Sequence, residues 1–482
     1  MIKKFFVRHH IEIFLILIIT SIFLLNFGLY HYDYRFPLHA DDWIHISVAN
    51  DVTTGRTINE LDPYFNENIM FYPRGFHVML AEISKMSGLD MVDIARFFPA
   101  VFQSILALSI FLLLKKIVHP YAGLFGAFAV ITLRTHPTIL GPALLVPLNF
   151  GLILVPVMLY FFIRGYETKK PVWFFLGMSI WFVIFSFHFS SFIITTFIGV
   201  ISLTEIAFLK ERMKAMKAIL ISGVAFAVLM ALFMIRFYKT DIIKTITGLV
   251  QSSGSIIISP FSPLFLVNYL IAGFALIGLI YLLTRYKVGH VTILGWTIFI
   301  FFDLYLFFQS GGTFISYERS VFYATEVLII LGAIGLYYVA DFFRTYPKGL
   351  KYIPIIIFCS VLLLSFYVNV YEGRTYIYHL ISEEQFQTYK WLGENYGGSK
   401  FLTNHLHSLS LPYFHLKPVQ VSPMHAVPTG AFSEFGQDYY TRDVDYLYEK
   451  MKKYDATLIY AVGLDPERFE KVYDNPPIYR IK

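Results

Sequence analysis

The 482-residue sequence has little charge and almost no cysteine. Asp, Glu, Lys and Arg make up 15% of the chain, whereas 56% is hydrophobic and 18% is aromatic. This balance excludes an ordinary soluble domain and predicts a polytopic membrane protein. The only cysteine, Cys359, lies in an apolar run, which excludes an intrachain disulfide. Stability must therefore come from helix packing.

The excess of basic residues, a formal net charge of +6, does not indicate nucleic-acid binding. Lys and Arg occur in short clusters between apolar runs and form no stripe with interleaved aromatic residues. The sequence shows no internal repeat of fixed period and no low-complexity tract. We therefore expect membrane lipids, and no nucleic acid, among the partners.

Apolar runs of about 20 residues are long enough to cross a bilayer. The first run is longer than a signal-peptide core, and no small-residue cleavage pattern precedes Ala40, so we predict a retained anchor. The sequence predicts an α-helical polytopic protein with about 11 spans. These are 11–30, 97–114, 119–134, 138–163, 171–188, 190–209, 218–237, 263–284, 291–309, 320–340 and 352–370.

Lysine and arginine counts in the short loops predict a cytoplasmic N-terminus in the cell membrane. The loop 31–96 and the tail 371–482 then lie on the extracytoplasmic side. The tail is polar, with helical patterns in "SEEQFQTYKWLGENYG" and "RDVDYLYEKMKKY" and strand-like runs in "SKFLTN", "KPVQVS" and "ATLIYAV". We predict a transmembrane domain, 1–370, followed by a small external α/β domain, 371–482.

Two adjacent carboxylates, Asp41 and Asp42, stand shortly after the first span. A carboxylate pair at a membrane surface can take a proton from a hydroxyl acceptor or hold a divalent cation against a phosphate. The alternative is that one of them caps a helix that starts at "DWIHISVAND". The residues around the pair favour one of these two interpretations.

The residues that follow the pair form an ordered pattern over 30–115. After the carboxylates come Gly55, the aromatic-proline element "YPRGFH", a further glycine, and Arg96 at the start of the second span. This order resembles the first external loop of the GT-C glycosyltransferases. These polytopic enzymes use polyprenyl-phosphate-linked sugars and include protein mannosyltransferases, the lipid A aminoarabinose transferase and the catalytic subunit of oligosaccharyltransferase.

The resemblance implies roles for several residues. Asp41 matches the family's catalytic base and Asp42 its acidic neighbour, while Arg96 matches an arginine that opens the second span and would bind the donor phosphate. Many relatives have Lys-Pro-Pro where this chain has Tyr-Pro-Arg-Gly, so Arg74 would replace the lysine charge, although guanidinium and ammonium are not equivalent partners for phosphate. Tyr72 and His77, the first and last residues of the element "YPRGFH", are predicted substrate contacts.

Transfer from a lipid phosphate needs further cations at the leaving group. Arg236 and Arg319 stand at predicted outer helix ends, and Arg319 is the preferred phosphate ligand because its neighbour Tyr317 can fix its rotamer and contact substrate. The alternative for each arginine is a side chain that snorkels to lipid headgroups.

Three polar residues interrupt apolar spans and are predicted substrate contacts. Asp303 and Glu326 lie about 10 Å below the outer ends of consecutive spans. The alternative for this pair is structural, with a proton or a water shared between the two carboxylates. His188, in "SFHFSSF", either contacts a substrate or bonds across helices in a polar turn.

Asp41, Asp42, His45 and His77 together offer ligands for a divalent metal, Mg²⁺ or Mn²⁺. The alternative is chance scatter, because the chain has 15 histidines.

The sequence thus favours a membrane glycosyltransferase that moves a sugar from a polyprenyl-phosphate donor to a lipid, glycan or protein acceptor on the extracytoplasmic face. A secondary transporter or lipid-linked glycan flippase is the alternative from another class, and a catalytically inactive scaffold is a third. Transporters concentrate polar groups at the membrane midplane, whereas here the polar chemistry gathers in one outer loop.

Overall fold

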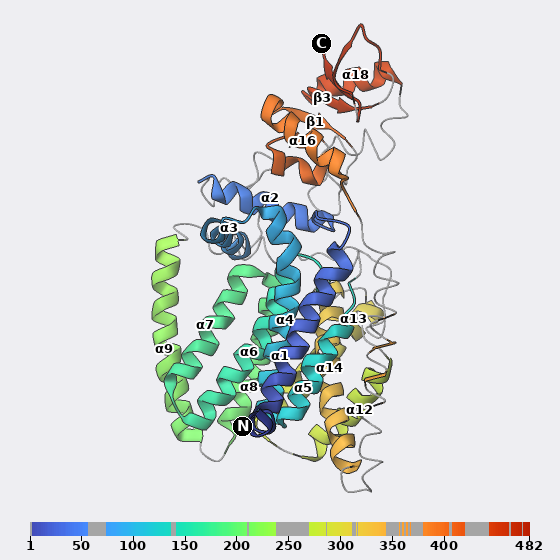
Figure 1. Ribbon diagram of the computed structural model, residues 1–482. Coiled ribbons are helices and arrows are strands. Elements are labelled where there is room, and N and C mark those ends of the chain that lie inside the picture. The colour runs from blue at the N-terminus through green and yellow to red at the C-terminus, as the bar shows by residue number, and fades with distance from the viewer. Residues whose placement is uncertain are drawn as a thin grey trace.

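The computed structural model describes residues 2–55, 74–135, 141–209, 212–237, 269–285, 287–310, 315, 317–343, 379–403, 407–419, 443–461, 464–474 and 476–482, with a few isolated positions between 356 and 367. Long helices form a bundle, and a smaller part built from the C-terminal residues stands on one end of it (Figure 1). The chain is therefore largely α-helical, as predicted.

The bundle is built from apolar helices. They are α1 (Ile2–His31), α4 (Met91–Ile117), α5 (Pro120–Ala129), α6 (Pro147–Thr168), α7 (Pro171–Phe187), α8 (Phe189–Ala207), α9 (Arg212–Phe237), α12 (Tyr269–Thr284), α13 (His290–Ser310) and α14 (Tyr317–Phe343).

Six helical segments in the described part are long and apolar enough to cross a bilayer. They are His9–His31, Met91–Ile117, Pro147–Thr168, Phe189–Ala207, His290–Gln309 and Tyr317–Phe343, and shorter apolar helices accompany them. The chain is a polytopic membrane protein. The last predicted span, 352–370, falls outside the described residues except at isolated positions, so the count of eleven stays a prediction.

One predicted span begins in the wrong place. The range 138–163 was expected to be helical throughout, but α6 begins only at Pro147 and continues to Thr168. Proline suits the first helical turn and disfavours helical backbone in the residue before it, and Val146 is extended. The described residues before α6, 141–146, form a buried non-helical segment. Asn149 closes this segment by donating to the carbonyls of Gly141 (3.0 Å) and Leu144 (2.7 Å).

Small residues let α12 and α14 approach closely. A side chain at Gly278 would overlap the carbonyl of Leu331, and one at Gly335 would overlap the carbonyl of Phe274. Backbone-to-backbone packing of this kind is typical of helix pairs in membranes. It fixes α14, whose first turn carries Arg319.

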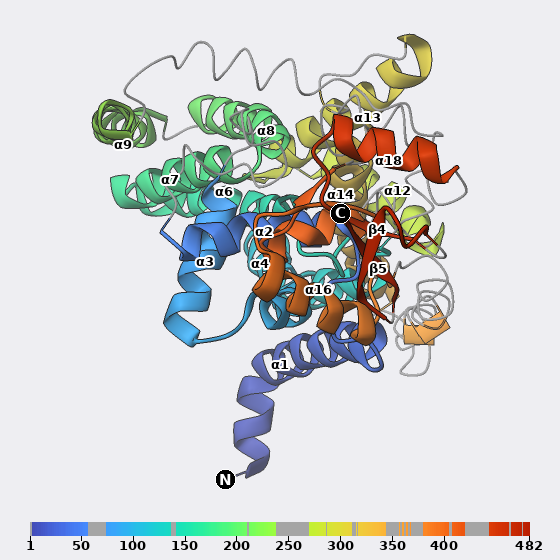
Figure 2. The same cartoon turned by 90° about the horizontal axis from the view of Figure 1, so that it is seen from above.

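Two short helices lie across the end of the bundle opposite the N-terminus (Figure 1). They are α2 (Ala40–Thr53) and α3 (Gly75–Ser87), both from the first predicted external loop. Seen from above, α2 lies over the bundle near α4, with α3 beside it (Figure 2). This end of the molecule carries both Asp41 and Asp42.

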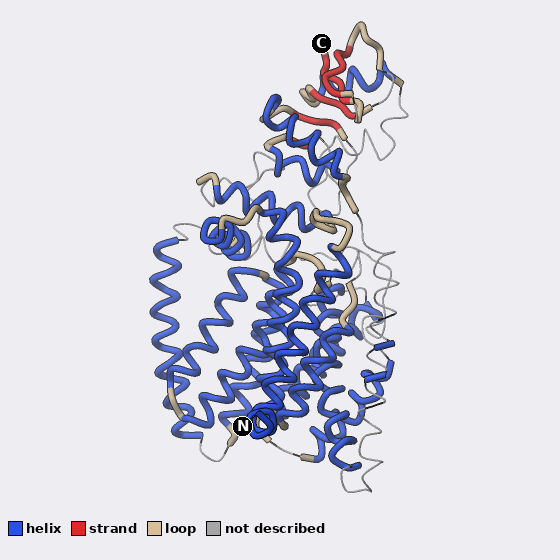
Figure 3. The backbone as a smooth tube through the Cα atoms, viewed as in Figure 1, coloured by secondary structure: helices blue, strands red, loops and turns tan. Residues whose placement is uncertain are grey.

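The strands gather in the C-terminal segment, residues 379–482 (Figure 3). The sheet has the order β2-β1-β3-β5-β4, with β1 (Lys400–Leu402) parallel to β2 (Lys417–Pro418) and β3 (Leu458–Tyr460), and an antiparallel hairpin of β4 (Phe469–Tyr473) and β5 (Ile478–Ile481) beyond. The helical parts are α16 (Glu383–Tyr396), the 3₁₀ segment η4 (His407–Phe414) and α18 (Val444–Lys453). The predicted α/β character of the tail is confirmed.

The C-terminal segment rests on the first external loop. Tyr34 Oη donates to the carbonyl of Ile381 (3.0 Å), and its ring stacks on His379 with centroids 4.0 Å apart. Arg35 and Glu383 form an exposed ion pair at 2.9 Å. The loop and the tail therefore lie at the same end of the bundle, as predicted.

Candidate active site

The carboxylate pair occupies the first turn of α2. His39 is the N-cap residue, and its Nδ1 accepts from the Asp41 amide at 3.2 Å. Asp42 is the third helical residue, and its Oδ2 accepts from the His39 amide. A reciprocal arrangement of this kind satisfies amides that the helix itself leaves unpaired. The N-cap is therefore His39 and neither of the two carboxylates, and Asp42 completes the capping box from the third helical position.

The carboxylate of Asp42 is held by three main-chain amides. Oδ2 accepts from Leu38 (3.1 Å) and His39 (3.2 Å), and Oδ1 accepts from Leu145 (2.8 Å) in the non-helical segment before α6. The residue is 1% exposed. Burial raises the pKa of Asp42 to about 8, and the amide donors oppose that rise. Asp42 thereby joins α2 to the bundle.

Asp41 has a different environment. Its side chain is 24% exposed, and its carboxylate lies 3.9 Å from His39 Nδ1. The first turn of α2 points amide dipoles towards it, which favours a negative charge there. Of the two carboxylates, Asp41 is thus the more exposed to solvent.

His45 and His77 lie against each other where α2 packs on α3. His45 Nδ1 and His77 Nε2 are 2.9 Å apart, so one ring donates to the other. Burial lowers the pKa of His77 well below its ordinary value, and the nearby His45 and Arg74 lower it further. His77 is therefore neutral at physiological pH.

Gly75 is the point at which α3 packs against the end of α7. A Cβ there would lie 2.6 Å from the Ser186 carbonyl and 2.7 Å from Phe187 Cδ1, at the end of α7. Only glycine allows α3 to pack this closely. Arg74, directly before it, is thereby brought to the turn between α7 and α8. Tyr72 lies outside the described residues.

His188 occupies that turn and caps α8. Its Nδ1 accepts from the Ser191 amide at 3.2 Å and lies 2.6 Å from Ser191 Oγ. Arg319, at the start of α14, and His45 are near enough to act on His188 electrostatically. The structure therefore gathers Arg319, His188 and His45 at one end of the bundle.

Two more polar residues lie at this end: Ser191, from the polar turn "SFHFSSF", and Tyr323, which sequence reasoning missed. A Cβ at Gly151 of α6 would lie 2.7 Å from Tyr323 Oη and would overlap Ser191 Oγ, so both hydroxyls converge on α6. Ser191 and Tyr323 are fully buried. A lone Tyr in an apolar helix carries no distinguishing pattern, and only the packing of α6, α8 and α14 brings the two residues together.

The other predicted residues lie as follows. Tyr317 stacks on Phe307 with centroids 4.2 Å apart. Arg96 donates to the carbonyl of His31 (3.3 Å) and lies over the ring of Phe27 at 5.0 Å, so it fastens α4 to α1. Arg236 belongs to α9, and its side chain lies outside the described part.

Asp303 and Glu326, the two carboxylates within apolar helices, have different surroundings. Asp303 accepts from Ser320 Oγ, and neither carboxylate oxygen of Glu326 has a hydrogen-bond partner among the described residues. Ser320 of α14 thus links α14 to Asp303 of α13.

Solved structures share the overall fold of this chain. AglB, the oligosaccharyltransferase of Archaeoglobus fulgidus in complex with an inhibitory peptide and a dolichol-phosphate, matches with a TM-score of 0.66 at 12% identity, over 95% of this chain and 70% of AglB. ArnT from Cupriavidus metallidurans bound to undecaprenyl phosphate matches with a TM-score of 0.57 at 13% identity, over 97% of both chains. This chain has the GT-C fold.

A third GT-C structure, the mycobacterial arabinofuranosyltransferase AftD, matches with a TM-score of 0.56 at 12% identity, over 97% of this chain and 40% of AftD. No protein-family model and no curated protein matches the sequence. The GT-C fold that the loop pattern implied is thus confirmed by architecture, at identities too low to show more than the fold.

Proposed function

We propose that this protein is a membrane glycosyltransferase that moves a sugar from a polyprenyl-phosphate-linked donor to an acceptor at the end of the bundle where α2 lies. In the predicted orientation this end is extracytoplasmic. The observation that carries the proposal is that the two carboxylates have different environments. Asp42 is buried among main-chain donors, whereas Asp41 stays partly exposed.

The reaction assigns one task to each group. An acceptor hydroxyl oxygen bonds to the anomeric carbon, and its proton passes to Asp41 as general base. The bond between the anomeric carbon and the phosphate oxygen breaks, and the polyprenyl phosphate leaves with the electron pair. Arg319 and Arg74, both near the turn at His188, stabilise the charge that develops on that phosphate.

The complexes of similar structures support the donor class. AglB and ArnT were solved with dolichol-phosphate and undecaprenyl phosphate, and an Archaeoglobus fulgidus oligosaccharyltransferase was solved with a tethered acceptor peptide. The acceptor predicted here is a lipid, a glycan or a protein.

A divalent metal fits the described residues poorly. A similar structure, of an Archaeoglobus fulgidus oligosaccharyltransferase, holds Zn and sulfate, but here Asp42 is engaged by three amides and His45 by His77. No group of three His, Cys, Asp or Glu in the described part is arranged to hold a metal ion. We therefore assign no metal ligand among the described residues.

The test separates an enzyme from a transporter. The purified protein is reconstituted in liposomes with undecaprenyl-phosphate and dolichyl-phosphate sugars that carry a tritiated sugar, and with a membrane extract as acceptor. A transferase releases free polyprenyl phosphate and moves tritium to the acceptor. Donor that crosses the bilayer intact would establish the flippase instead.

A further inference from the structure

The C-terminal segment touches the helix that carries the proposed base. Trp43 of α2 is fully buried, and its ring meets Tyr413 edge-on at 5.6 Å and Phe414 at 6.2 Å. Phe414 in turn meets Phe386 of α16 at 5.1 Å. An aromatic cluster therefore joins η4 and α16 to α2.

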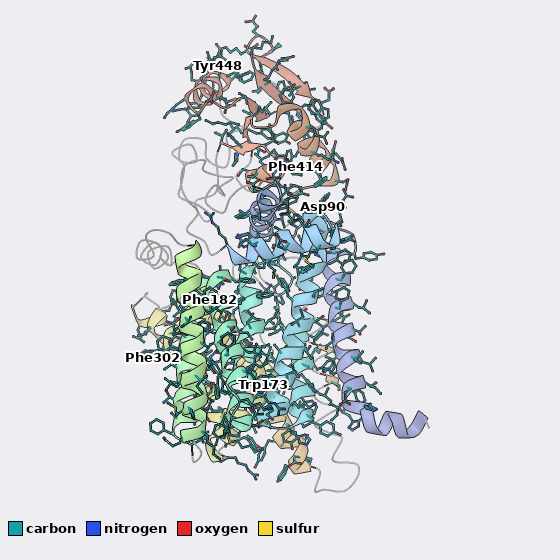
Figure 4. The ribbon with its side chains drawn as sticks, turned by 90° about the vertical axis from the view of Figure 1, so that its left-hand side faces the viewer. Asp90, Trp173, Phe182, Phe302, Phe414 and Tyr448 are labelled. Carbon is teal, nitrogen blue, oxygen red and sulfur yellow. The ribbon has the colours of Figure 1, made fainter. Side chains whose placement is uncertain are left out.

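Tyr413 also reaches the bundle. Its Oη donates to Asp90 Oδ1 at 3.0 Å, and the same oxygen accepts from the Val92 amide (2.6 Å) as the N-cap of α4. Asp90 lies directly below Phe414 at the junction of the two parts (Figure 4). Burial raises the pKa of Tyr413, so the phenol stays protonated and keeps its donor hydrogen. One side chain thus contacts both α2 and α4.

Helical geometry relates this contact to Asp41. Trp43 follows Asp41 by two residues, which is about 200° around the helix axis. The C-terminal segment therefore presses on one side of α2, while Asp41 and His45, one turn apart, share the opposite side. On that side His45 contacts α3. The angle at which α2 presents Asp41 depends on both supports.

We propose that Tyr413 is a positioning residue that sets the orientation of α2, and with it Asp41, by bridging Trp43 and Asp90. The inference rests on the proposed function of Asp41 as base. It gives the C-terminal segment a part in orienting the proposed base.

The test uses Tyr413→Phe, which keeps the ring against Trp43 and removes only the donor hydroxyl. Because a small misplacement of a catalytic group can cost up to about 100-fold, we expect kcat to fall by at least about tenfold, with the donor KM unchanged. Asp90→Ala should reproduce this loss. Asp90→Asn should stay near wild type, because the amide oxygen still accepts from Tyr413 and Val92. An unchanged kcat in Tyr413→Phe would overturn the proposal.

The matched control is Tyr448→Phe. Tyr448 belongs to the same C-terminal segment but packs against Phe469, far from α2 (Figure 4). It should leave kcat and KM unchanged. A loss in Tyr448→Phe equal to that in Tyr413→Phe would show a general weakening of the segment and would refute the specific bridge.

Hydrogen exchange separates this proposal from the proposed function. In Tyr413→Phe the amides of residues 38–48 should exchange faster than in the wild type, whether or not the wild type transfers sugar. If Tyr413→Phe exchanges faster but the wild type transfers no sugar, the bridge is supported and the glycosyltransferase function is refuted. If exchange is unchanged but the wild type transfers sugar, the function is supported and the bridge is refuted.

Discussion

Replacing each carboxylate of α2 by its amide tests the division of labour between them. Asp41→Asn keeps the size of the side chain but cannot accept a proton, so turnover should fall by about 10²–10⁴-fold. Stability should change little, because the charge at the helix start contributes only about 0.3–1 kcal/mol. The variant should be folded and inactive.

Asp42→Asn perturbs a different quantity. Both oxygens of Asp42 accept from amides, and an Asn side chain must turn its own NH₂ towards either Leu145 or the pair Leu38 and His39. Leaving a buried donor unpaired costs about 1–3 kcal/mol. We therefore expect a clearly lower unfolding temperature and a smaller loss of turnover than in Asp41→Asn.

The assay combines two measurements on each purified variant in nanodiscs. Release of free polyprenyl phosphate from a tritiated donor gives turnover, and tryptophan fluorescence during heating gives the unfolding temperature. The reasoning would be refuted by a stable, inactive Asp42→Asn beside a fully active Asp41→Asn. A double Asn variant at the wild-type rate would leave the pair with no role beyond capping.

The remaining predictions concern the phosphate, the α3 packing, the pH profile and the topology. Arg319→Lys should stay folded but lose most turnover, because the lysine ammonium cannot form the two parallel hydrogen bonds that a guanidinium makes to a phosphate. A wild-type rate in this variant would show that Arg319 does not bind the donor phosphate. Gly75→Ala should lower turnover and cost about 1–3 kcal/mol of unfolding free energy, because the new Cβ meets the end of α7; unchanged melting would contradict the packing. Folding raises the pKa of Asp42 from 3.8 to about 8, so between these pH values the folded state keeps a proton that the unfolded state releases. The stability that protonated Asp42 contributes is therefore fully present below about pH 4 and is lost as the pH rises to about 8. Asp42→Asn should flatten that slope in a melting series, and an equally steep slope would exclude Asp42 as its source. In a cysteine-free background, an impermeant thiol reagent should label both Ser87→Cys and Glu394→Cys from outside intact cells, and labelling of only one would contradict the shared side.

Much of the fold could be predicted from the sequence because apolar length and polarity changes are local signals. The helices near Arg96, His188 and Arg319, and the alternating tail, lie where these signals placed them. The start of α6 was missed because the residues before Pro147 are as apolar as a span, and hydropathy does not register the backbone conflict that proline imposes.

The candidate site was harder to predict, because its residues come from elements far apart in the chain. The sequence indicated Asp41 and Asp42 as a pair but left open which of them is buried. The answer depends on Leu145, more than a hundred residues away, whose amide turns Asp42 inward. Likewise Tyr413 carries no motif, and its role follows only from contact with Trp43 and Asp90.

The central claim is that a lipid phosphate binds at the end of the bundle that carries Asp41. An experimental structure of Asp41→Asn with an undecaprenyl-phosphate sugar tests it most directly, because this variant should bind the donor without consuming it. The account predicts density for the phosphate within hydrogen-bond distance of Arg319 and Arg74, with the anomeric carbon facing residue 41. Phosphate density at the opposite end of the bundle, or away from both arginines, would contradict it.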